Sequence, residues 1–299
     1  MNIAAIVVTH NPKEEFLNFL NIIVEQSDLV VLVDNNSSSI IIEKIFQKKE
    51  KNLILVKNKD NLGLAKAQNQ AIKIAIDANM DAVLLLDDDT VVDTDYVENM
   101  KKSFSNYVKE HESERIGIFA SNFIDKNIGG NGNFGRLTSD GFETLNFDVV
   151  ASNYILVSFV YSSGSLIPIE VFKSVGIFEE SFFIDNIDTE FCLRLLKNKY
   201  KIIVTKKACL IHTVGEREKH KFLGLTIKPN FHSAKRKYYF ARNGEAILKK
   251  YRESFPGYKR IFRKKLIHDL LGIILYEPNK WKKIVAVVKG INDGKKLKI

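Results

Sequence analysis

Three consecutive aspartates, Asp87, Asp88 and Asp89, are the segment of the sequence best suited to chemistry. They follow the apolar residues 83–86 directly, at the tip of a predicted buried strand. Carboxylates in such a place are costly unless a cation or hydrogen bonds compensate their charge. Side chains two residues apart in extended backbone share one side, so Asp87 and Asp89 suit one Mg²⁺ or Mn²⁺ ion, which prefers oxygen ligands and keeps positions open for substrate phosphates. The alternative is a solvated acidic turn that caps the next helix.

A second group of carboxylates lies within residues 182–194, among apolar neighbours at a predicted junction between a loop and a helix. A carboxylate near apolar walls has a raised proton affinity, which suits a general base. The alternative is structural: Asp185 or Asp188 caps the helix, and Glu190 forms an ion pair with Arg194 one turn later.

His212 follows the apolar residues 208–211 and is a further candidate. Imidazole is a common metal ligand, whereas a single histidine at such a position also fits a structural role. The two cysteines, Cys192 and Cys209, are too few for a disulfide framework, and we expect cytosolic free thiols.

The elements that position these residues alternate between strand and helix. Apolar β-branched runs predict buried strands, and apolar residues three and four apart predict the helices between them. The predicted strands cover residues 3–9, 29–33, 53–56 and 82–86, and the helices cover residues 13–25, 40–49 and 64–78. This alternation with short connections predicts parallel strands with right-handed crossovers, which is a doubly wound α/β fold.

Ligands bind such sheets at the carboxyl ends of the strands. Polar residues follow all four strands, and we expect them to meet at this edge: Thr9, His10, Asn11, Asp34, Asn35, Asn61 and the aspartates 87–89. Asp34 either accepts hydrogen bonds from a nucleobase or ribose, or is a turn residue. Asn61 and Gly63 open a helix that contains Lys66, and helix starts favour anions such as a diphosphate. The alternative there is an ordinary turn with a solvated lysine.

The remaining chain continues with mixed patterns and then becomes helical. Strands are expected at 116–123, 154–168, 201–204 and 208–211, helices at about 94–109, 171–175 and 188–198, a mobile glycine-rich loop at 129–141, and helices again from about 230. We therefore expect a catalytic domain at 1–229, with a nucleotide-binding half at 1–110 and an acceptor half at 111–229, and a helical C-terminal region at 230–299.

The composition is that of a globular protein, with 45% hydrophobic and 27% charged residues among 299. Residues 1–245 carry 30 Lys and Arg against 32 Asp and Glu, whereas residues 246–299 carry 15 against 4. The pI of about 9.2 therefore reflects the C-terminal region, and with no RNA or DNA motif present we expect no nucleic-acid partner. No apolar stretch of about 18 residues predicts a transmembrane helix.

Common nucleotide-binding signatures are absent from the sequence. No GxGxxG follows the first strand and no GxxxxGK[ST] occurs, which disfavours a dinucleotide dehydrogenase or a P-loop enzyme. A sugar nucleotidyltransferase is disfavoured because its glycine-rich, basic phosphate loop is missing after the first strand.

In their order along the chain, these segments resemble the inverting GT-A glycosyltransferases of family 2, and most closely the bacterial rhamnosyltransferase-like members. The resembling segments are AIVVTHNP (5–12), VLVDNNS (31–37), NLGLAKAQN (61–69), LLLDDDT (84–90), FIDNID with its continuation (183–194), YYFARN (238–243) and GINDG (290–294). Each motif alone is weak, whereas seven in the family's order are specific. The resemblance implies a GT-A fold, a Rossmann-like mixed sheet flanked by helices.

The resemblance also implies roles. Asp87 and Asp89 match the DxD motif that binds the metal, Mg²⁺ or Mn²⁺, and the diphosphate. Asp188 matches the catalytic base, and His212 matches a histidine that binds the metal and comes late in the family's sequences. With the nucleoside positions Thr9, Asn11 and Asp34 implied in the same way, the residues expected to bind the donor are Thr9, Asn11, Asp34, Asn61, Gly63, Lys66, Asp87 and Asp88.

The implied function is a metal-dependent inverting hexosyltransferase of cell-surface polysaccharide synthesis, which moves rhamnose from dTDP-rhamnose to a hydroxyl of a glycan or lipid-linked acceptor. Two departures bear on the donor: Asp88 replaces a glutamine common in the rhamnosyl subgroup, and Asn186 and Ile187 precede Asp188 where an acidic neighbour is common. The alternatives are a UDP-hexose transferase for galactose, glucose or galactofuranose, and a non-catalytic nucleotide-sugar-binding protein.

The C-terminal region suggests a second role. Residues 232–251 mix aromatic and basic side chains, and residues 264–276 contain many apolar ones. Basic charge with an apolar face suits peripheral contact with the inner face of the cytoplasmic membrane, where lipid-linked acceptors lie. The alternative is a helical subdomain packed on the body or on another protomer of a homo-oligomer.

Overall fold

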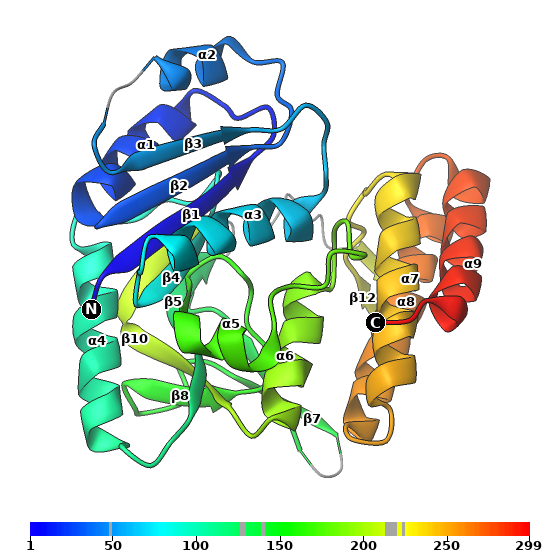
Figure 1. Ribbon diagram of the computed structural model, residues 1–299. Helices are drawn as coiled ribbons and strands as arrows, with labels where there is room; N and C mark the ends of the chain where they lie inside the picture. Colours follow the sequence, from blue (N-terminus) through cyan, green and yellow to red (C-terminus); the bar gives the residue numbers. More distant parts are fainter. Residues whose placement is uncertain (48–49, 126–129, 139–140, 213–219, 223–224) are drawn as a thin grey trace.

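The computed structural model describes residues 1–47, 50–125, 130–138, 141–212, 220–222 and 225–299 (Figure 1). Within these ranges the centre of the molecule is an eight-stranded sheet with the strand order β3-β2-β1-β4-β9-β5-β10-β8. Its strands are β1 (Ile3–Thr9), β2 (Leu29–Asp34), β3 (Leu53–Lys57), β4 (Ala82–Asp87), β5 (Ile116–Asp125), β8 (Tyr154–Val157), β9 (Ser165–Pro168) and β10 (Lys201–His212).

Strands β1 to β4 are parallel, as the alternating pattern predicts. Beyond β4 the sheet becomes mixed, because β9 pairs antiparallel with both β4 and β5, and β8 pairs antiparallel with β10. The single strand-like segment predicted at 154–168 is thus two strands in different parts of the sheet, and the turn between them places residues 161–164 beside the end of β4. The parallel strands predicted from the alternation are thus confirmed for β1 to β4, and the mixed sheet expected from the resemblance is confirmed for the sheet as a whole.

Helices cover both faces of the sheet because its strands are apolar on both sides. One face packs on α1 (Glu15–Gln26), α2 (Ile40–Phe46) and α4 (Tyr96–Glu110). The other face packs on α3 (Leu64–Asp77), α5 (Ile169–Val175) and α6 (Ile187–Lys197). Alternate residues of β1 illustrate the division, since Ala4 and Ile6 belong to the second core and Ile3, Ala5 and Val7 to the first.

Three helices follow the sheet: α7 (Ala234–Tyr251), α8 (Pro256–Leu275) and α9 (Lys280–Lys296). Figure 1 shows them as a separate layer beside α6. The backbones of α7 and α9 come close together, because a Cβ atom on Gly290 or Gly294 would collide with the carbonyl oxygens of Tyr238 and Arg242. No helix within the described ranges is long and apolar enough to span a bilayer.

Part of the expected glycine-rich loop is a β-hairpin. Strand β6 (Phe134–Leu137) pairs antiparallel with β7 (Phe142–Leu145), so the prediction of a mobile loop is wrong for residues 134–137. The carbonyl oxygen of Gly135 accepts a hydrogen bond of 2.7 Å from the amide of Ser158, and Phe134 is buried against Phe123. These tertiary contacts order a segment whose glycines suggest flexibility. A second short hairpin joins β11 (His220–Phe222) and β12 (Leu225–Ile227).

Candidate active site

The acidic run lies where β4 leaves the sheet. Asp87 is the last residue of β4 and lies opposite Val8 of β1 in the register. The amide of Asp87 donates to the Oγ atom of Ser163 at 3.1 Å, and the hydroxyls of Ser163 and Thr90 lie 2.9 Å apart. Ser163 therefore contacts both the first residue of the acidic run and Thr90, which directly follows it. No local pattern in the sequence marks this serine, because its contact with β4 depends on where β9 inserts.

Negative charge accumulates at this strand tip. Burial, together with the carboxylates of Asp89, Asp88 and Asp188, raises the pKa of Asp87 to about 7, while Arg236 opposes the shift. Because three carboxylates and one guanidinium are the described charges that act on Asp87, the arrangement favours binding of a further cation. The oxygen ligands present suit a hard divalent ion such as Mg²⁺ or Mn²⁺.

Asp88 makes its contact within the protein. Its Oδ2 atom accepts a hydrogen bond of 2.6 Å from the hydroxyl of Thr9, a buried residue at the end of β1. Burial raises the pKa of Asp88, and the Thr9 hydroxyl opposes that rise. The contact joins the tips of β1 and β4, so two of the residues predicted to bind the donor stabilise each other.

The loops after β1 and β2 are also joined. The carboxylate of Asp34 is fully buried and accepts from the amide of Ser37 at 3.1 Å, as in a turn. Asn11 has a left-handed backbone with φ 56°, and its Oδ1 atom accepts from the amide of Ser38 at 2.9 Å. The contacts of Asp34 are therefore those of a turn residue, and Asp34 lies at the tip of β2 as predicted.

The segment that opens α3 connects the two halves of the site. The Oδ1 atom of Asn61 accepts from the amide of Gly63 at 3.0 Å, and Lys66 is exposed in the first turn of α3. Gly63 has φ 85°, and a Cβ atom there would lie 2.6 Å from the carbonyl oxygen of Phe183. The same oxygen accepts from the amide of Leu64 at 2.7 Å. Glycine is required here because the loop that leads to Asp188 packs directly on this turn.

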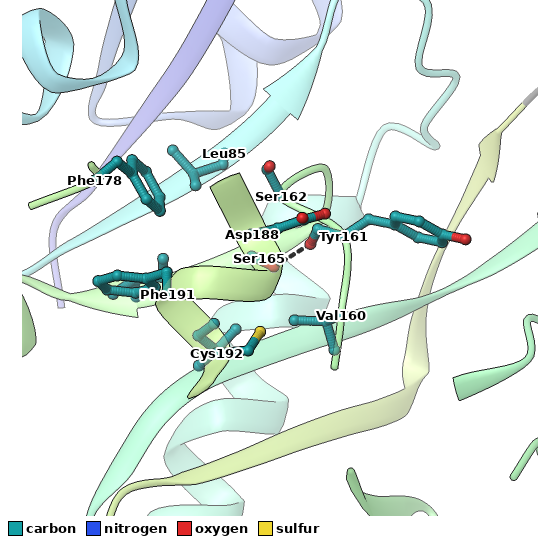
Figure 2. A pocket seen from close by; sticks show the side chains of 11 residues that line it. Leu85, Val160, Tyr161, Ser162, Ser165, Phe178, Asp188, Phe191 and Cys192 are labelled. Carbon is teal, nitrogen blue, oxygen red and sulfur yellow. Dashed lines mark hydrogen bonds between the residues drawn. The ribbon is translucent and has the colours of Figure 1, made fainter. Parts of the chain in front are cut away.

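Asp188 lies in the first turn of α6 and lines a largely apolar pocket (Figure 2). The pocket is lined by Leu85, Ile118, Val160, Tyr161, Ser162, Ser165, Ile167, Phe178, Phe191 and Cys192. Burial among these side chains raises the pKa of Asp188, while the amide of Thr189, which donates to it at 2.7 Å, and the charge of Lys265 on α8 oppose the shift. A carboxylate with a raised proton affinity, at the edge of the acidic run, has the character of a general base.

The other acidic residues of this segment are engaged in structural pairs. Asp185 accepts from Nε and Nη2 of Arg236 at 3.1 and 3.0 Å. Glu190 is fully buried and pairs with Arg194, which confirms the structural alternative for these two residues. Glu190 also accepts from the Tyr251 hydroxyl at 2.8 Å. The sequence does not predict a role for Arg236 at this site, since this residue lies in α7, far along the chain from Asp87.

His212 is placed by its backbone alone. It ends β10, and its neighbour Ile211 forms an antiparallel bridge with Val91, with amide to carbonyl distances of 2.8 and 3.1 Å. Val91 is two residues beyond Asp89, so the main chain at His212 runs beside the acidic run. Its side chain lies outside the described residues. Among the described side chains, no group of three His, Cys, Asp or Glu residues is arranged as a metal site.

Comparison with known proteins identifies the family. Residues 4–163 match the family described as glycosyl transferase family 2. The dTDP-rhamnosyl transferase RfbF of Shigella flexneri is 30% identical over 295 residues, which cover 97% of this chain and 95% of that protein.

Solved structures agree on the fold. The S. aureus TarS fragment 1–349 in complex with UDP-GlcNAc has a TM-score of 0.56 at 17% identity, covering 98% of this chain and 80% of that chain. GalNAc-T7 with UDP, GalNAc and Mn²⁺ has a TM-score of 0.56 at 13% identity, covering 90% and 57%. The resemblance found in the motifs is thus confirmed, and the chain is a nucleotide-sugar glycosyltransferase that belongs to glycosyltransferase family 2.

Proposed function

We propose that this enzyme is a metal-dependent inverting transferase that moves rhamnose from dTDP-rhamnose to a hydroxyl of a glycan or lipid-linked acceptor in cell-surface polysaccharide synthesis. The observation that carries the proposal is the group of carboxylates at the tip of β4, where burial and the charges of Asp89, Asp88 and the candidate base Asp188 raise the pKa of Asp87. Mg²⁺ or Mn²⁺ would be held by Asp87 and Asp89, with His212 as a further ligand. When bound, the ion neutralises charge on the departing nucleotide diphosphate.

Asp188 acts as the general base. It accepts the proton of the acceptor hydroxyl while that oxygen forms a bond to the anomeric carbon. The bond between the anomeric carbon and the donor phosphate oxygen breaks in the same displacement, so the nucleotide diphosphate leaves and the anomeric configuration inverts. The raised pKa of Asp188 supports this role, because a more basic carboxylate accepts the proton more readily.

The remaining polar residues at the strand tips hold the donor. Thr9, Asn11 and Asp34 would position the nucleoside, with Thr9 also fixing Asp88 through its 2.6 Å hydrogen bond. The start of α3, with Asn61, Gly63 and the exposed Lys66, would receive the diphosphate, because a helix N-terminus and a free ammonium favour anions. The close packing of Gly63 on Phe183 connects this phosphate-binding turn to the segment before Asp188.

The nature of the donor rests on one relative. RfbF is described as a dTDP-rhamnosyl transferase, whereas TarS and GalNAc-T7 are seen with UDP-GlcNAc or with UDP and GalNAc. We favour dTDP-rhamnose because RfbF matches nearly the whole chain at the highest identity of these three. A UDP-hexose, with galactose, glucose or galactofuranose, is the second candidate.

A donor panel tests the proposal. Thermal shift and release of nucleotide diphosphate are measured with dTDP-rhamnose, UDP-galactose, UDP-glucose and UDP-galactofuranose, each with Mn²⁺, with Mg²⁺ and with EDTA. We expect the largest shift and the fastest release with dTDP-rhamnose and a metal ion. Equal release in EDTA would refute the metal dependence, and preference for a UDP-hexose would replace the donor. Binding without release by any donor or acceptor would favour a non-catalytic nucleotide-sugar-binding protein.

The site of action that fits this acceptor is the inner face of the cytoplasmic membrane. Lipid-linked glycans are presented there, and residues 246–299 carry 15 basic against 4 acidic residues. An enzyme held at that surface would meet its acceptor by diffusion in two dimensions.

A further inference from the structure

Helix α9 presents a row of apolar side chains to solvent. Trp281, Val285 and Val288 are at positions i, i+4 and i+7, which share one helix face. Their exposed fractions are 80%, 62% and 52%. Single exposed apolar residues are ordinary on protein surfaces, whereas a row of them that includes tryptophan marks an interaction site.

The opposite face of α9 fixes this row in place. Gly290 and Gly294 face α7 so closely that a Cβ atom on either would collide with the carbonyl oxygens of Tyr238 and Arg242. Val287 is buried in a small apolar core with residues of α7 and α8. Since α9 cannot rotate without losing these contacts, its apolar row points outward as part of the fold.

Lysines border the row on both sides. At 3.6 residues per turn, exposed lysines lie along one flank at Lys282, Lys289 and Lys296 and along the other at Lys280 and Lys295. An apolar centre between cationic borders is the chemistry of a helix that lies in the interface of an anionic bilayer. Each lysine near such a surface adds electrostatic attraction.

We infer that this face of α9, defined by the apolar row and its five bordering lysines, binds the surface of an anionic lipid bilayer. A second copy of the chain fits less well, because it would bring two sets of lysines together, and lysine is depleted at protein interfaces. The inference deepens the proposed function and rests on it only for the lipid-linked acceptor, since binding to lipid requires no sugar transfer.

The exposed apolar row lies on α9 rather than within residues 264–276, where the sequence suggests a membrane contact. Of the apolar residues in the segment 264–276, Leu266, Leu270 and Ile273 pack inside the helical layer. Ile267 and Ile274 of that segment are exposed, yet they lie on α8 rather than in the row of α9. Trp281, the most exposed of the large apolar side chains that the structure describes, lies beyond that segment in α9.

The test uses the full chain, because Trp281 is its single tryptophan. Its fluorescence is titrated with vesicles of phosphatidylcholine and phosphatidylglycerol in a ratio of two to one, and with vesicles of phosphatidylcholine alone. We expect a blue shift and co-flotation with the anionic vesicles that weaken as salt is added, and neither with the neutral ones. An emission that stays that of a solvated indole with anionic vesicles would overturn the inference.

Variants separate lipid binding from its alternatives. The triple variant Trp281→Ser/Val285→Ser/Val288→Ser should lose at least about tenfold in vesicle affinity. Replacing Lys282, Lys289 and Lys296 by Gln should cost roughly fivefold for each lysine and reduce the salt dependence. Two variants at other exposed apolar sites, Ile40→Ser and Val149→Ser, are matched controls that should bind like the parent. If the triple variant floats as well as the parent, α9 is not the lipid-binding face.

Two further outcomes keep the proposals distinct. Asp188→Asn should still bind anionic vesicles, so that a failure of the catalytic proposal leaves this inference standing. A blue shift of Trp281 that grows with protein concentration in the absence of lipid, together with sedimentation as a dimer, would assign the face to a second copy and overturn the inference.

Discussion

Two consecutive residues of α7, Arg236 and Lys237, belong to clusters of charge that are built in opposite ways. Arg236 faces the acidic run and Asp185, where carboxylates outnumber cations and burial raises the pKa of Asp87 to about 7. Lys237 is buried among the C-terminal helices, where it donates to the carboxylate of Asp269 and, at 3.0 Å, to Oε1 of Glu277.

The cluster around Lys237 is balanced. Lys283 of α9 donates to the second oxygen of Glu277 at 2.7 Å, so two cations meet the two carboxylates of Asp269 and Glu277. Burial alone would raise the pKa of Glu277, yet its hydrogen bonds and ion pairs with Lys283 and Lys237 hold it below its ordinary value.

The difference in charge balance suits the two clusters to different roles, one in stabilising the fold and the other in binding a ligand. Buried charges that are matched in number by charges of opposite sign join elements and need no further ion from outside the protein. A cluster with an excess of one sign is unstable by itself and gains most from a ligand of the opposite sign. We therefore expect a cation to bind at the tip of β4, whereas the C-terminal cluster holds α7, α8 and α9 together.

The largest expected effect is at the candidate base. Asp188→Asn should reduce turnover by about 10²- to 10⁴-fold, because the amide cannot accept the proton of the acceptor. Donor binding, followed by thermal shift, should remain near that of the parent. Turnover of the parent should also fall as pH drops through the raised pKa of Asp188. The exposed Asp77→Asn is the matched control. Turnover of Asp188→Asn close to that of the control would remove Asp188 from the mechanism.

The balanced cluster should respond in stability instead. Lys237→Met leaves the carboxylates of Asp269 and Glu277 buried without their main cation, and should lower the free energy of unfolding by about 3–5 kcal/mol. The neighbouring Lys235→Met, at an exposed position whose ammonium lies 4.4 Å from the Phe183 ring, should cost less than about 1 kcal/mol. Urea unfolding measures both. Equal losses in the two variants would show that the cluster does not join the helices.

The acidic cluster around Asp87 should make the free energy of unfolding fall as pH rises, whereas a carboxylate in an ion pair makes it rise with pH. The folded pKa of Asp87 is about 7 against an ordinary 3.8, so the folded state binds more protons than the unfolded state between these values. Stability without metal should therefore fall as pH rises from about 4 to 7, by up to about 1 kcal/mol per pH unit.

Three measurements of the melting temperature against pH test this dependence. Asp87→Asn should flatten the decline, and Mn²⁺ should reverse it in the parent near pH 7 by about 2–3 kcal/mol at saturating concentration. The exposed Asp60→Asn should behave like the parent. A decline that persists unchanged in Asp87→Asn would assign it to another group.

The sequence predicts the N-terminal half of the fold and its polar edge because these depend on local patterns. Apolar runs, turn residues and short connections place Thr9, Asp34 and the acidic run at neighbouring strand tips. The parts that escape prediction depend on contacts between distant segments. Ser163 reaches Asp87 only because β9 enters the sheet antiparallel beside β4. Strand β6 is held by contacts with distant segments, namely those of Gly135 with residues 158–159 and of Phe134 with Phe123 of β5.

The same limit applies to the balance of charge. Counting residues shows that the C-terminal region is basic, but not that Lys237 and Lys283 turn inward while five lysines of α9 face solvent. Which cation meets which carboxylate depends on the packing of α7 against α9 and on the loop before α6, and this packing has no local signature.

The smallest effect is expected at Arg236, which acts on the acidic run and precedes Lys237 of the balanced cluster in α7. Arg236→Gln removes the cation that opposes the acidic run, so the KM for the donor should rise by about tenfold because the diphosphate meets a more negative site. The pH at which Mn²⁺ stabilises the protein should shift slightly upward, since the pKa of Asp87 rises further without Arg236. Arg236→Lys keeps the charge but loses the two-pronged contact with Asp185. If charge is what matters, Arg236→Lys recovers most of the donor affinity. If Arg236 only anchors α7 to the loop before Asp188, both variants lose stability alike and the KM for the donor stays unchanged.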